Sequence, residues 1–531
     1  MKVALVKGSL SGEGAYNESF GITVPPLGLA SLAGALRSSG KHEAFIIDAS
    51  AKGLDVDATA KMLEELNADV VGVTMNASPY YKFGKRLAEA VKRRMRDTVL
   101  VAGGHHATFL YPQILREGFD FAVLGEGEET FTELINALEC DGETRDVKGI
   151  AYLENGKVVR TEPREYLKNL DDLPIPAFDL LERDLYRADI LEPGSHIITA
   201  ETSRGCPFNC EYCSVTAMWG HIWRFKSTER ILAELEIIRN LGYKWVFIVD
   251  DNFIVHTNLA DRERLFREIL RRRLNLRFIA QIRADTIVKN PSIIKLASEA
   301  GLRLAFVGIE SGSNDVLRKM KKGISTDISS KAVKILHQNG ILTHGGFIIG
   351  APYENRKQIN ETIRYAENLI NEGLDSAQFS IYTPLPGSRS FYEALAEDKL
   401  ITYNWELYNC LNPVLKTKLN PIWLFLKASM ANYLFYLKKW IRTKLGGRVE
   451  NPAVNIEEYK ALVNNASTFL AKKLLKHIRG FIMQPMKALK LWFQLKRAER
   501  LRDELVSEIL QAIQNFAAKE NWNINFSRFK G

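Results

Sequence analysis

Cysteine is scarce in this sequence, which has only five among its 531 residues. So few thiols exclude a disulfide framework and favour a reducing compartment. No uninterrupted apolar run reaches the ~18–20 residues that a membrane-spanning helix needs. The N-terminus also lacks the long apolar stretch and small-residue cleavage site of a signal peptide. We therefore expect a cytoplasmic protein, and the length predicts about three domains.

Acidic residues are lacking in one part of the chain. The formal net charge is +9, yet residues 411–531 contain 22 Lys and Arg against 8 Asp and Glu. That segment alone carries +14, and the first 410 residues carry −5. The excess of positive charge therefore belongs to the C-terminal tail alone.

Three of the five cysteines lie in one run with the spacing Cys206-x3-Cys210-x2-Cys213. Three thiolates this close can hold three irons of a 4Fe–4S cluster and leave the fourth iron open for a substrate or cofactor. A structural zinc ion would need a fourth ligand, which is not obvious nearby, and a disulfide would leave an odd thiol. The cluster is the favoured interpretation, with zinc or a disulfide as alternatives. Cys140 and Cys410 are too few for a second cluster.

The cysteine run, with Tyr212 just before its third cysteine, resembles the radical S-adenosylmethionine (radical SAM) superfamily. In that superfamily the open iron chelates the amino and carboxylate groups of S-adenosylmethionine, whose reductive cleavage gives a 5′-deoxyadenosyl radical. The resemblance implies that Cys206, Cys210 and Cys213 ligate the cluster and that Tyr212 lies against the adenine. It also implies an electron donor such as flavodoxin or ferredoxin.

Residues 1 to about 140 alternate strand-like apolar runs with amphipathic helices, which predicts a parallel sheet with helices on both faces. The expected strands are Val3–Val6, Ala44–Ile47, Val70–Val73, Val99–Val101 and Phe121–Val123, and helices are expected at Leu27–Ser38 and Phe83–Arg94. Ligands of such sheets bind at the carboxyl ends of the strands. Glycine-rich segments follow several of these strands and would let backbone approach a large flat ligand closely.

Three segments resemble the cobalamin-binding domain that is fused to many radical SAM enzymes: Pro25-Pro-Leu-Gly-Leu-Ala30, Gly103-Gly-His-His-Ala-Thr108 and Gly125-Glu-Gly-Glu128. The resemblance implies a cobalamin-binding domain over residues 1–145. The implied cobalamin-binding residues are Thr74, Gly103, Gly104, His105, Gly125 and Glu126. The Asp-x-His-x-x-Gly motif of the cobalamin-dependent mutases is missing, which leaves Asn76, His105 and His106 as weak candidates for the lower cobalt ligand. The alternative is a flavodoxin-like domain without cofactor that only packs on its neighbour.

Residues 146–194 read as a connector. Val147–Leu153 and Val158–Thr161 flank Glu154-Asn-Gly, which predicts a hairpin. The segment Leu173-Pro-Ile-Pro-Ala-Phe178 then interrupts regular structure.

Residues 195–400 again alternate strands and helices, and six βα units predict a partial TIM-like barrel with its chemistry at the strand carboxyl ends. The expected strands are Ile197–Glu201, Trp245–Val249, Arg277–Gln281, Arg303–Ile309, Thr343–Ile349 and Ser376–Tyr382. Polar residues cluster where these strands end. By resemblance to the radical SAM core, Asp250 and Asp251 lie near the methionine amino group, Glu310 and Arg283 near the ribose and carboxylate, and the Gly346–Gly350 backbone under the adenine. A turn or an exposed strand-end charge is the alternative for each.

The tail over residues 401–531 is basic and reads as helical, with 15 aromatic residues in 411–531. Its most apolar parts are Pro421–Trp440 and Leu470–Leu501, and the second also carries nine Lys and Arg. A helical cap over the barrel mouth is the first interpretation. An interfacial membrane surface at the inner face of the membrane is the second, compatible with the first. Nucleic-acid contact is the least favoured, because no recognised RNA-binding module is present.

The fold class is therefore α/β: a Rossmann-like cobalamin-binding sheet, a partial (β/α)6 radical SAM barrel and a helical C-terminal region. The layout resembles the cobalamin-dependent radical SAM family over residues 1–400. The resemblance implies cobalamin, S-adenosylmethionine and a 4Fe–4S cluster as cofactors, and methylation of an unactivated carbon of a hydrophobic, lipid-like or tetrapyrrole-like substrate. Ring closure or carbon–carbon coupling without methyl transfer is the alternative among enzymes. A sensor without turnover is the alternative from another class.

Overall fold

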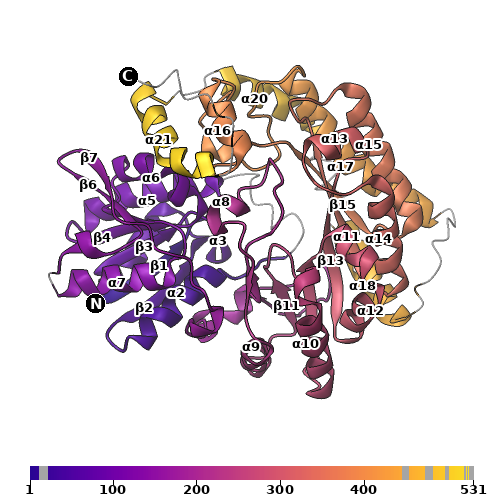
Figure 1. The fold of residues 1–531 in the computed structure, drawn as a ribbon, viewed down its shortest axis with the longest axis horizontal. Coiled ribbons are helices and arrows are strands. Elements are labelled where there is room, and N and C mark those ends of the chain that lie inside the picture. Colours follow the sequence, from indigo (N-terminus) through magenta and orange to yellow (C-terminus); the bar gives the residue numbers. More distant parts are fainter. Residues whose placement is uncertain are drawn as a thin grey trace.

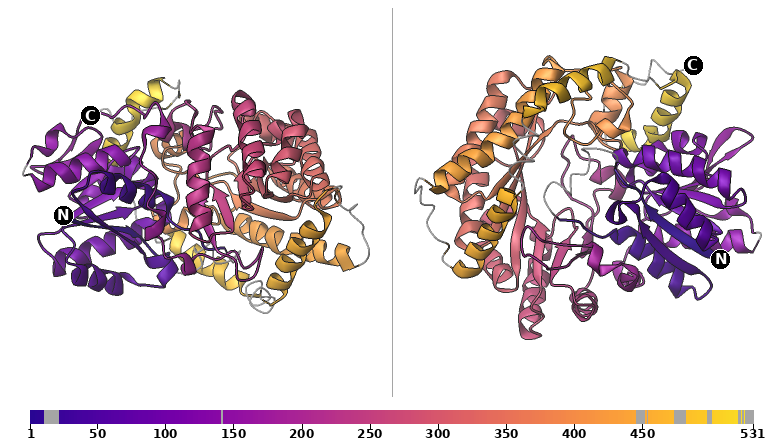
Figure 2. Two further views of the ribbon diagram at one scale, coloured as in Figure 1. Left: turned by 90° about the horizontal axis from the view of Figure 1, so that it is seen from below. Right: turned by 180° about the vertical axis from the view of Figure 1, so that it is seen from behind.

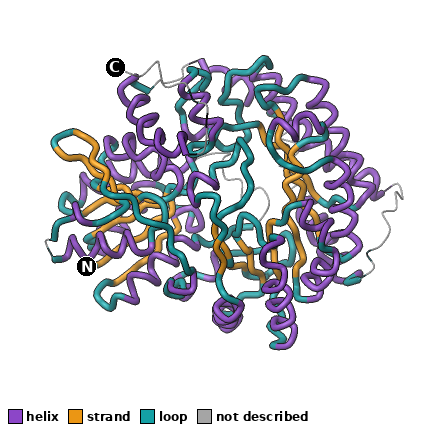
Figure 3. The backbone as a smooth tube through the Cα atoms, in the orientation of Figure 1, coloured by secondary structure: helices purple, strands orange, loops and turns teal. Residues whose placement is uncertain are grey.

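The protein is described here by a computed structural model that covers residues 1–10, 22–140, 142–444, 454–472, 482–496 and 501–519, with the single residues 452, 522 and 524. Two sheets lie side by side, and each is flanked by its own helices (Figure 1). Figure 3 separates the strands into these two groups, with loops between them. The predicted α/β class is confirmed.

The first sheet has seven strands in the order β2-β1-β3-β4-β5-β6-β7, of which the first five are parallel. Its strands are β1 (Lys2–Lys7), β2 (Glu43–Asp48), β3 (Val70–Thr74), β4 (Val99–Gly103), β5 (Phe121–Val123), β6 (Ile150–Glu154) and β7 (Lys157–Arg160). The helices are α2 (Leu27–Ser38), α3 (Ala49–Lys52), α4 (Val56–Leu66), α5 (Tyr81–Arg94), α6 (His105–Arg116) and α7 (Glu128–Glu139). The order 2-1-3-4-5 is that of flavodoxin-like sheets, whose ligands bind at the strand carboxyl ends.

The predicted hairpin forms, but it belongs to the first sheet. Asn155 and Gly156 both have positive φ, as a two-residue hairpin turn requires. β6 pairs antiparallel with β5, so that Ile150 lies opposite Val123. The sheet therefore reaches residue 160, beyond the boundary at residue 145 that the change in sequence pattern suggests.

The second sheet has six parallel strands in the order β8-β11-β12-β13-β14-β15. They are β8 (Ile197–Ala200), β11 (Trp245–Ile248), β12 (Arg277–Gln281), β13 (Leu302–Glu310), β14 (Leu342–Ile349) and β15 (Ser376–Ile381). A short antiparallel pair, β9 (Ser203–Arg204) and β10 (Arg224–Phe225), follows β8. The helices of this part are α8 (Val215–Trp219), α9 (Thr228–Asn240), α10 (Leu259–Arg271), α11 (Ala284–Lys289), α12 (Pro291–Glu299), α13 (Asn314–Lys319), α14 (Thr326–Gln338), α15 (Arg356–Leu369) and α16 (Arg389–Ala396). All six predicted strands are present.

Local sequence sets where many of these helices begin. The side chains of Asp55, Ser227 and Asn355 each accept a hydrogen bond from a backbone N–H in the first turn of the helix that follows. Such caps satisfy donors that would otherwise lack a partner at a helix start. Gln358 completes a capping box with Asn355.

The described tail forms four helices: α17 (Pro421–Lys444), α18 (Ile456–Lys472), α20 (Gln484–Lys496) and α21 (Asp503–Lys519). Figure 2 (right) shows the orange helices of the tail along the outer face of the barrel and the yellow α21 beside the first sheet. The predicted second apolar stretch, Leu470–Leu501, falls partly outside the described residues. No described helix is long and apolar enough to cross a bilayer.

α17 covers the open edge of the barrel. The Asn432 side chain pairs with the edge strand, accepting from Phe379 N–H at 2.9 Å and donating to Phe379 C=O at 3.0 Å. The Tyr436 hydroxyl donates to Ala377 C=O at 3.1 Å, and the backbone C=O of Cys410 accepts from Ile381 N–H. Side chains and one loop carbonyl thus satisfy edge groups that a further strand would otherwise pair.

α18 and α21 hold other parts of the fold. On α18, Glu458 forms ion pairs with Arg277 at the start of β12 and with Arg303 on β13, both at 2.7 Å. α21 packs across α6 and α16, where Glu508 accepts from Arg116 at 2.7 Å (Figure 1). The tail therefore contacts both parts of the fold, through Glu458 on the barrel and Glu508 on α6.

Candidate active site

The carboxyl ends of the first sheet face the loop that carries the three cysteines. The His105 ring, at the start of α6, lies 6.2 Å from the ring of Trp219 on α8. The Arg204 guanidinium lies 5.6 Å from the centre of the same indole. The ligand-binding edges of both sheets therefore meet at one seam.

The cysteine loop begins with a residue that sequence reasoning missed. Gly205 has φ +97°, and a Cβ there would lie 2.0 Å from the backbone oxygen of Ile222. Only glycine allows this close approach, which directs the chain into Cys206. The loop then closes on itself, with Cys213 N–H donating to Cys210 C=O at 3.1 Å.

The three thiols are partly buried free cysteines that lie near enough to affect one another electrostatically. Burial raises the pKa of Cys206 to about 11 and that of Cys213 to about 12. The Asn252 side-chain amide donates to the Cys206 sulfur at 3.1 Å. Among the described residues, no three His, Cys, Asp or Glu side chains converge on one metal ion. A cluster does not need such convergence, since each thiolate binds a different iron, so this donor set fits a 4Fe–4S group.

Tyr212 and Glu310 meet beside the cysteines. The Tyr212 hydroxyl donates to Glu310 Oε1 at 3.0 Å, and Lys322 Nζ donates to the same oxygen at 2.7 Å. Glu310 has φ +63°, which is uncommon for a residue with a side chain and often marks functional strain. A Cβ at Gly308 would lie 2.4 Å from Glu310 Oε1, so this glycine leaves room for the pair.

Arg283 also lies at this end of the barrel. Its guanidinium lies 3.5 Å from the ring centre of Phe208, inside the cysteine loop. It donates to Asp285 at 3.0 Å and to the backbone oxygen of Lys322 at 2.9 Å. Tyr212, Glu310 and Arg283 thus lie together beside the cysteine loop.

The paired aspartates have different surroundings. Asp250 is buried and accepts from Thr202 N–H at 2.7 Å and from Ser203 Oγ at 2.6 Å. The Thr202 hydroxyl donates to it as well. Asp250 therefore braces the segment before Cys206. For Asp251, burial and the neighbouring Asp250 raise the pKa to about 7.

The two glycines expected under the adenine also differ. A Cβ at Gly346 would have only Val307 O as a neighbour, at 3.9 Å, so its face of the sheet is open. A Cβ at Gly350 would lie 2.4 Å from the Leu424 side chain of α17. Gly350 is therefore covered by the tail, and Gly346 alone offers open backbone.

The strand ends of the first sheet fit a large flat ligand. A Cβ at Gly103 or at Gly125 would meet nothing within 4 Å, and Gly125 has φ +78°. Gly104, with φ +91°, would bring a Cβ within 2.9 Å of the Asn76 backbone nitrogen. Thr74 ends β3 beside Gly103, its partner in the β3–β4 register. Open backbone on neighbouring strands is the surface that cobalamin would need.

The neighbouring residues His105 and His106 differ in their contacts. Burial lowers the pKa of His105 to about 4 and that of His106 to about 3. The His106 ring is buried. Its Nδ1 lies 2.9 Å from Ser78 Oγ, and its centre lies 5.3 Å from the centre of the Trp405 ring. His106 is therefore a packed core residue, whereas His105 faces the seam.

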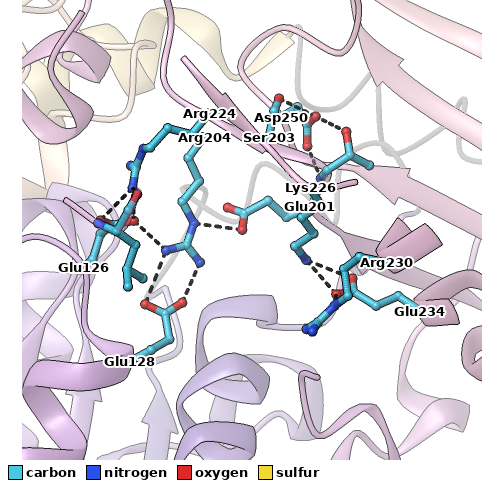
Figure 4. A network of polar contacts seen from close by, with 12 residues as sticks. Glu126, Glu128, Glu201, Ser203, Arg204, Arg224, Lys226, Arg230, Glu234 and Asp250 are labelled. Carbon is cyan, nitrogen blue, oxygen red and sulfur yellow. Dashed lines mark hydrogen bonds and ion pairs between the residues drawn. The ribbon is translucent and has the colours of Figure 1, made fainter. Parts of the chain in front are cut away.

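Glu126, expected to bind cofactor, instead joins a buried ionic network across the seam (Figure 4). Arg204 donates to Glu126 at 2.8 Å, to Glu128 at 2.5 Å and to Glu201 at 2.8 Å. Arg224 donates to Glu126 at 2.9 Å. Burial alone would lower the pKa of Arg204, but Glu201 and Glu128 raise it well above its usual value. This network ties the start of α7 to the segment that leads into the cysteines.

Sequence reasoning missed the cationic half of this network, together with Asn252 and Lys322. Arg204 stands two residues before Cys206, and Asn252 directly follows the aspartate pair. Their positions next to recognised motifs were the available signal. Lys322 carries no such signal, because it stands outside the recognised motifs, 12 residues after Glu310.

Two family models match the chain. The "Radical SAM superfamily" model matches residues 200–366, and the "B12 binding domain" model matches residues 15–135. The first match begins just before the cysteine loop. The second covers four of the five parallel strands of the first sheet and its open glycines.

Curated relatives share both parts. An uncharacterised methyltransferase of Pyrococcus horikoshii is 38% identical over 76% of this chain and 86% of its own length. The hopanoid C-3 methylase of Methylococcus capsulatus is 30% identical over 76% of this chain and 75% of its own. The anaerobic magnesium-protoporphyrin IX monomethyl ester cyclase of Rubrivivax gelatinosus is 29% identical over 78% and 74%.

A solved structure shares the fold. The cobalamin-dependent S-adenosylmethionine radical enzyme OxsB, solved with aqua-cobalamin and S-adenosylmethionine, superposes with a TM-score of 0.65. The match covers 98% of this chain and 84% of that chain at 17% sequence identity. The similarity therefore includes the C-terminal helices as well as the two sheets.

Proposed function

This chain belongs to the cobalamin-binding radical SAM family, and from that premise we propose that it methylates an unactivated carbon of a hydrophobic, lipid-like or tetrapyrrole-like substrate. The observation that carries the proposal is the meeting of two ligand edges. The open glycine edge of the first sheet faces the cysteine loop of the barrel at one seam. A methyl donor and a hydrogen-abstracting group must both reach one substrate carbon, and a shared seam is where they can.

The cysteine side would bind the iron–sulfur cluster and S-adenosylmethionine. In this proposal Cys206, Cys210 and Cys213 hold the cluster, and Tyr212, Asp251, Arg283 and Glu310 orient S-adenosylmethionine over the open backbone at Gly346. Asp250 and Gly350 act through the scaffold, by bracing Thr202 and by packing on Leu424. Lys322 holds the Glu310 carboxylate in place by an ion pair of 2.7 Å.

The cobalamin side would use Thr74, Gly103, Gly104, His105 and Gly125. Glu126 fixes the position of this edge through Arg204 and Arg224. When bound, the cluster, S-adenosylmethionine and cobalamin together supply a carbon radical and a transferable methyl group. The task of the protein is to hold these groups close to the substrate carbon and to exclude water.

Ring closure without methyl transfer is the second candidate. Similarity to the magnesium-protoporphyrin IX monomethyl ester cyclase favours it, and it would use the same residues. A sensor without turnover fits less well, because the strand ends of the barrel keep a full set of polar groups around the cysteines. We also propose a low-potential electron donor such as flavodoxin or ferredoxin, and contact of the C-terminal region with the inner face of a membrane.

The first test is anaerobic reconstitution with iron, sulfide and hydroxocobalamin. We expect about four irons per chain together with bound cobalamin. Cys213→Ala should lose most of the iron, whereas Cys410→Ala, which removes a free thiol outside the loop, should keep it. Equal iron loss in both variants would contradict the cluster assignment, and no bound cobalamin would contradict methyl transfer.

Product analysis separates the two candidate reactions. Reduced enzyme with substrate should form S-adenosylhomocysteine and 5′-deoxyadenosine in equal amounts if it transfers a methyl group by the proposed route. A cyclase would form 5′-deoxyadenosine alone. A reduced, fully loaded enzyme that never forms 5′-deoxyadenosine would leave the sensor as the better description.

A further inference from the structure

α20 carries two apolar faces. Its inner face packs into the protein through Ala488 and Leu491, which are both buried. Its opposite face exposes Met486, Leu489 and Phe493, with 62%, 56% and 48% of their surface accessible, and Ile482, two residues before the helix, is 67% exposed. The spacing of three and four residues from Met486 to Phe493 places these three side chains in one stripe along the helix. A surface helix of a globular protein normally exposes polar residues there.

The exposed stripe is not an isolated feature. Nine of the fifteen large hydrophobic residues that are exposed in the described chain lie on α17, on α20 or two residues before it. On α17 these are Met430, Leu437, Trp440 and Ile441. α17 and α20 pack against each other, and Figure 2 (right) shows both on the outside of the barrel. Exposed apolar side chains gathered on two helices that pack together are typical of an interaction site.

The charges beside the stripe are all of one sign. Lys487 and Lys490 flank it on one side, and Lys496 lies beyond Trp492 on the other, with its Nζ 3.9 Å from that indole ring. The sequence contains no Asp or Glu from residue 459 to residue 498. On α17, Lys438 and Lys439 are engaged with acidic residues of the barrel, so the cations nearest the stripe are those of α20.

We propose that the α20 stripe, with the exposed side chains of α17, is an interfacial surface that lies on an anionic lipid bilayer. Apolar side chains at the centre, an aromatic pair at the margin and lysines around them suit the boundary between acyl chains and anionic headgroups. A second copy of this chain is a poorer occupant. Docking two such faces together would bring Lys490 and Lys496 of both copies against one another.

The surface is connected to the site. The inner face of α20 belongs to a hydrophobic cluster against which Tyr212 and Ala217 also pack, on either side of Cys213. The helix that carries the stripe and the segment that carries the cysteines therefore pack into one hydrophobic cluster. The inference deepens the proposed function and rests on it in one respect, which is that a hydrophobic substrate would be reached from the membrane.

The test is sedimentation of the reconstituted full-length protein with vesicles of phosphatidylcholine, with and without phosphatidylglycerol. We expect binding to the anionic vesicles that weakens at high salt. Leu489→Glu combined with Phe493→Glu should weaken it by about tenfold or more. Leu270→Glu, which places the same charge on an exposed leucine of α10, should bind as the wild type does. Lys490→Glu with Lys496→Glu should lose the preference for phosphatidylglycerol.

The opposing outcomes are distinct. No binding to either vesicle would overturn the proposal, as would equal binding by the Leu489→Glu, Phe493→Glu variant. A concentration-dependent dimer that this variant abolishes would assign the surface to self-association instead. Formation of 5′-deoxyadenosine by the variant in vesicle-free solution separates this inference from the proposed function. If neither the wild type nor the variant forms 5′-deoxyadenosine, the proposed function is contradicted. If the variant still forms 5′-deoxyadenosine but no longer binds vesicles, the proposed lipid-binding surface is supported.

Discussion

Arg204 and Glu128 are joined across the seam between the two sheets by a buried contact of 2.5 Å, and Arg204 also reaches Glu126 and Glu201. One guanidinium thus contacts three carboxylates in a place that water hardly reaches. Removing one partner of a buried pair is far more costly than replacing the pair, because the remaining charge stays desolvated.

We therefore predict that Arg204→Met destabilises the protein by about 3–5 kcal/mol. Urea unfolding followed by circular dichroism would measure the loss as a lower midpoint. Arg264→Met, which breaks an exposed pair with Glu229, is the matched control and should cost less than about 1 kcal/mol. Equal shifts in the two variants would mean that the seam does not depend on this network.

The hydrogen bond from Asn252 to Cys206 should tune the reduction potential of the cluster. Donors to cluster sulfurs stabilise the more negative, reduced state. A difference of about 1 kcal/mol between the two states corresponds to about 40 mV for a one-electron couple. Asn252→Leu should therefore lower the potential by roughly that amount, and Asn252→Asp, which adds a negative charge, should lower it further. Anaerobic redox titration monitored by electron paramagnetic resonance gives the values, and an unchanged potential in both variants would contradict this role.

His344 should make the protein less stable in mild acid. Burial lowers the pKa of its imidazole to about 4, whereas an unfolded histidine titrates near 6.5. Between these values the unfolded chain binds more protons, so the free energy of unfolding falls as pH drops through this window. At pH 5 this difference in pKa lowers the free energy of unfolding by about 2 kcal/mol from its value near neutral pH.

His344→Gln can keep the contact to Ser376 and should remove about this amount of the stability loss between pH 7 and pH 5. Urea midpoints measured at several pH values would give the difference. A variant whose stability falls as steeply as that of the wild type would show that another group is responsible.

Asn432 should stabilise the barrel by completing its open edge. Asn432→Leu leaves both backbone groups of Phe379 without a partner and should cost about 2–4 kcal/mol. Tyr436→Phe removes a single bond to Ala377 C=O and should cost about 1 kcal/mol. Thermal unfolding should rank the variants in that order, and the reverse order would argue against the edge as the cause.

The strands were predictable because their apolar runs are short and bounded by glycine and polar residues. Leu27–Ser38 and Arg277–Gln281 have the predicted limits, since local sequence alone decides such elements. The hairpin at Asn155-Gly156 was also predictable, but its attachment to β5 was not. Strand pairing depends on tertiary contacts, which a turn motif does not encode.

A motif marks the cysteines, Tyr212 and Glu310, and the structure brings them together; their part in binding cofactors stays a prediction. The contacts of a residue were not predictable where one residue type can serve two purposes. Glu126 and Gly350 stand in recognised segments. In the structure Glu126 forms an ion pair with Arg204, and Gly350 packs against Leu424. Each of these contacts is made with a residue about 80 positions further along the chain, so a local sequence pattern cannot predict it.

The contact between Arg116 and Glu508 has a consequence for synthesis. The two residues are 392 positions apart, and Ala512 of α21 packs beside Tyr111 and Leu115 of α6. A ribosome adds roughly 5–20 residues per second, so α6 waits roughly 20–80 s for the helix that covers it. During that time the nascent first domain exposes an apolar surface that only the end of the same polypeptide can cover.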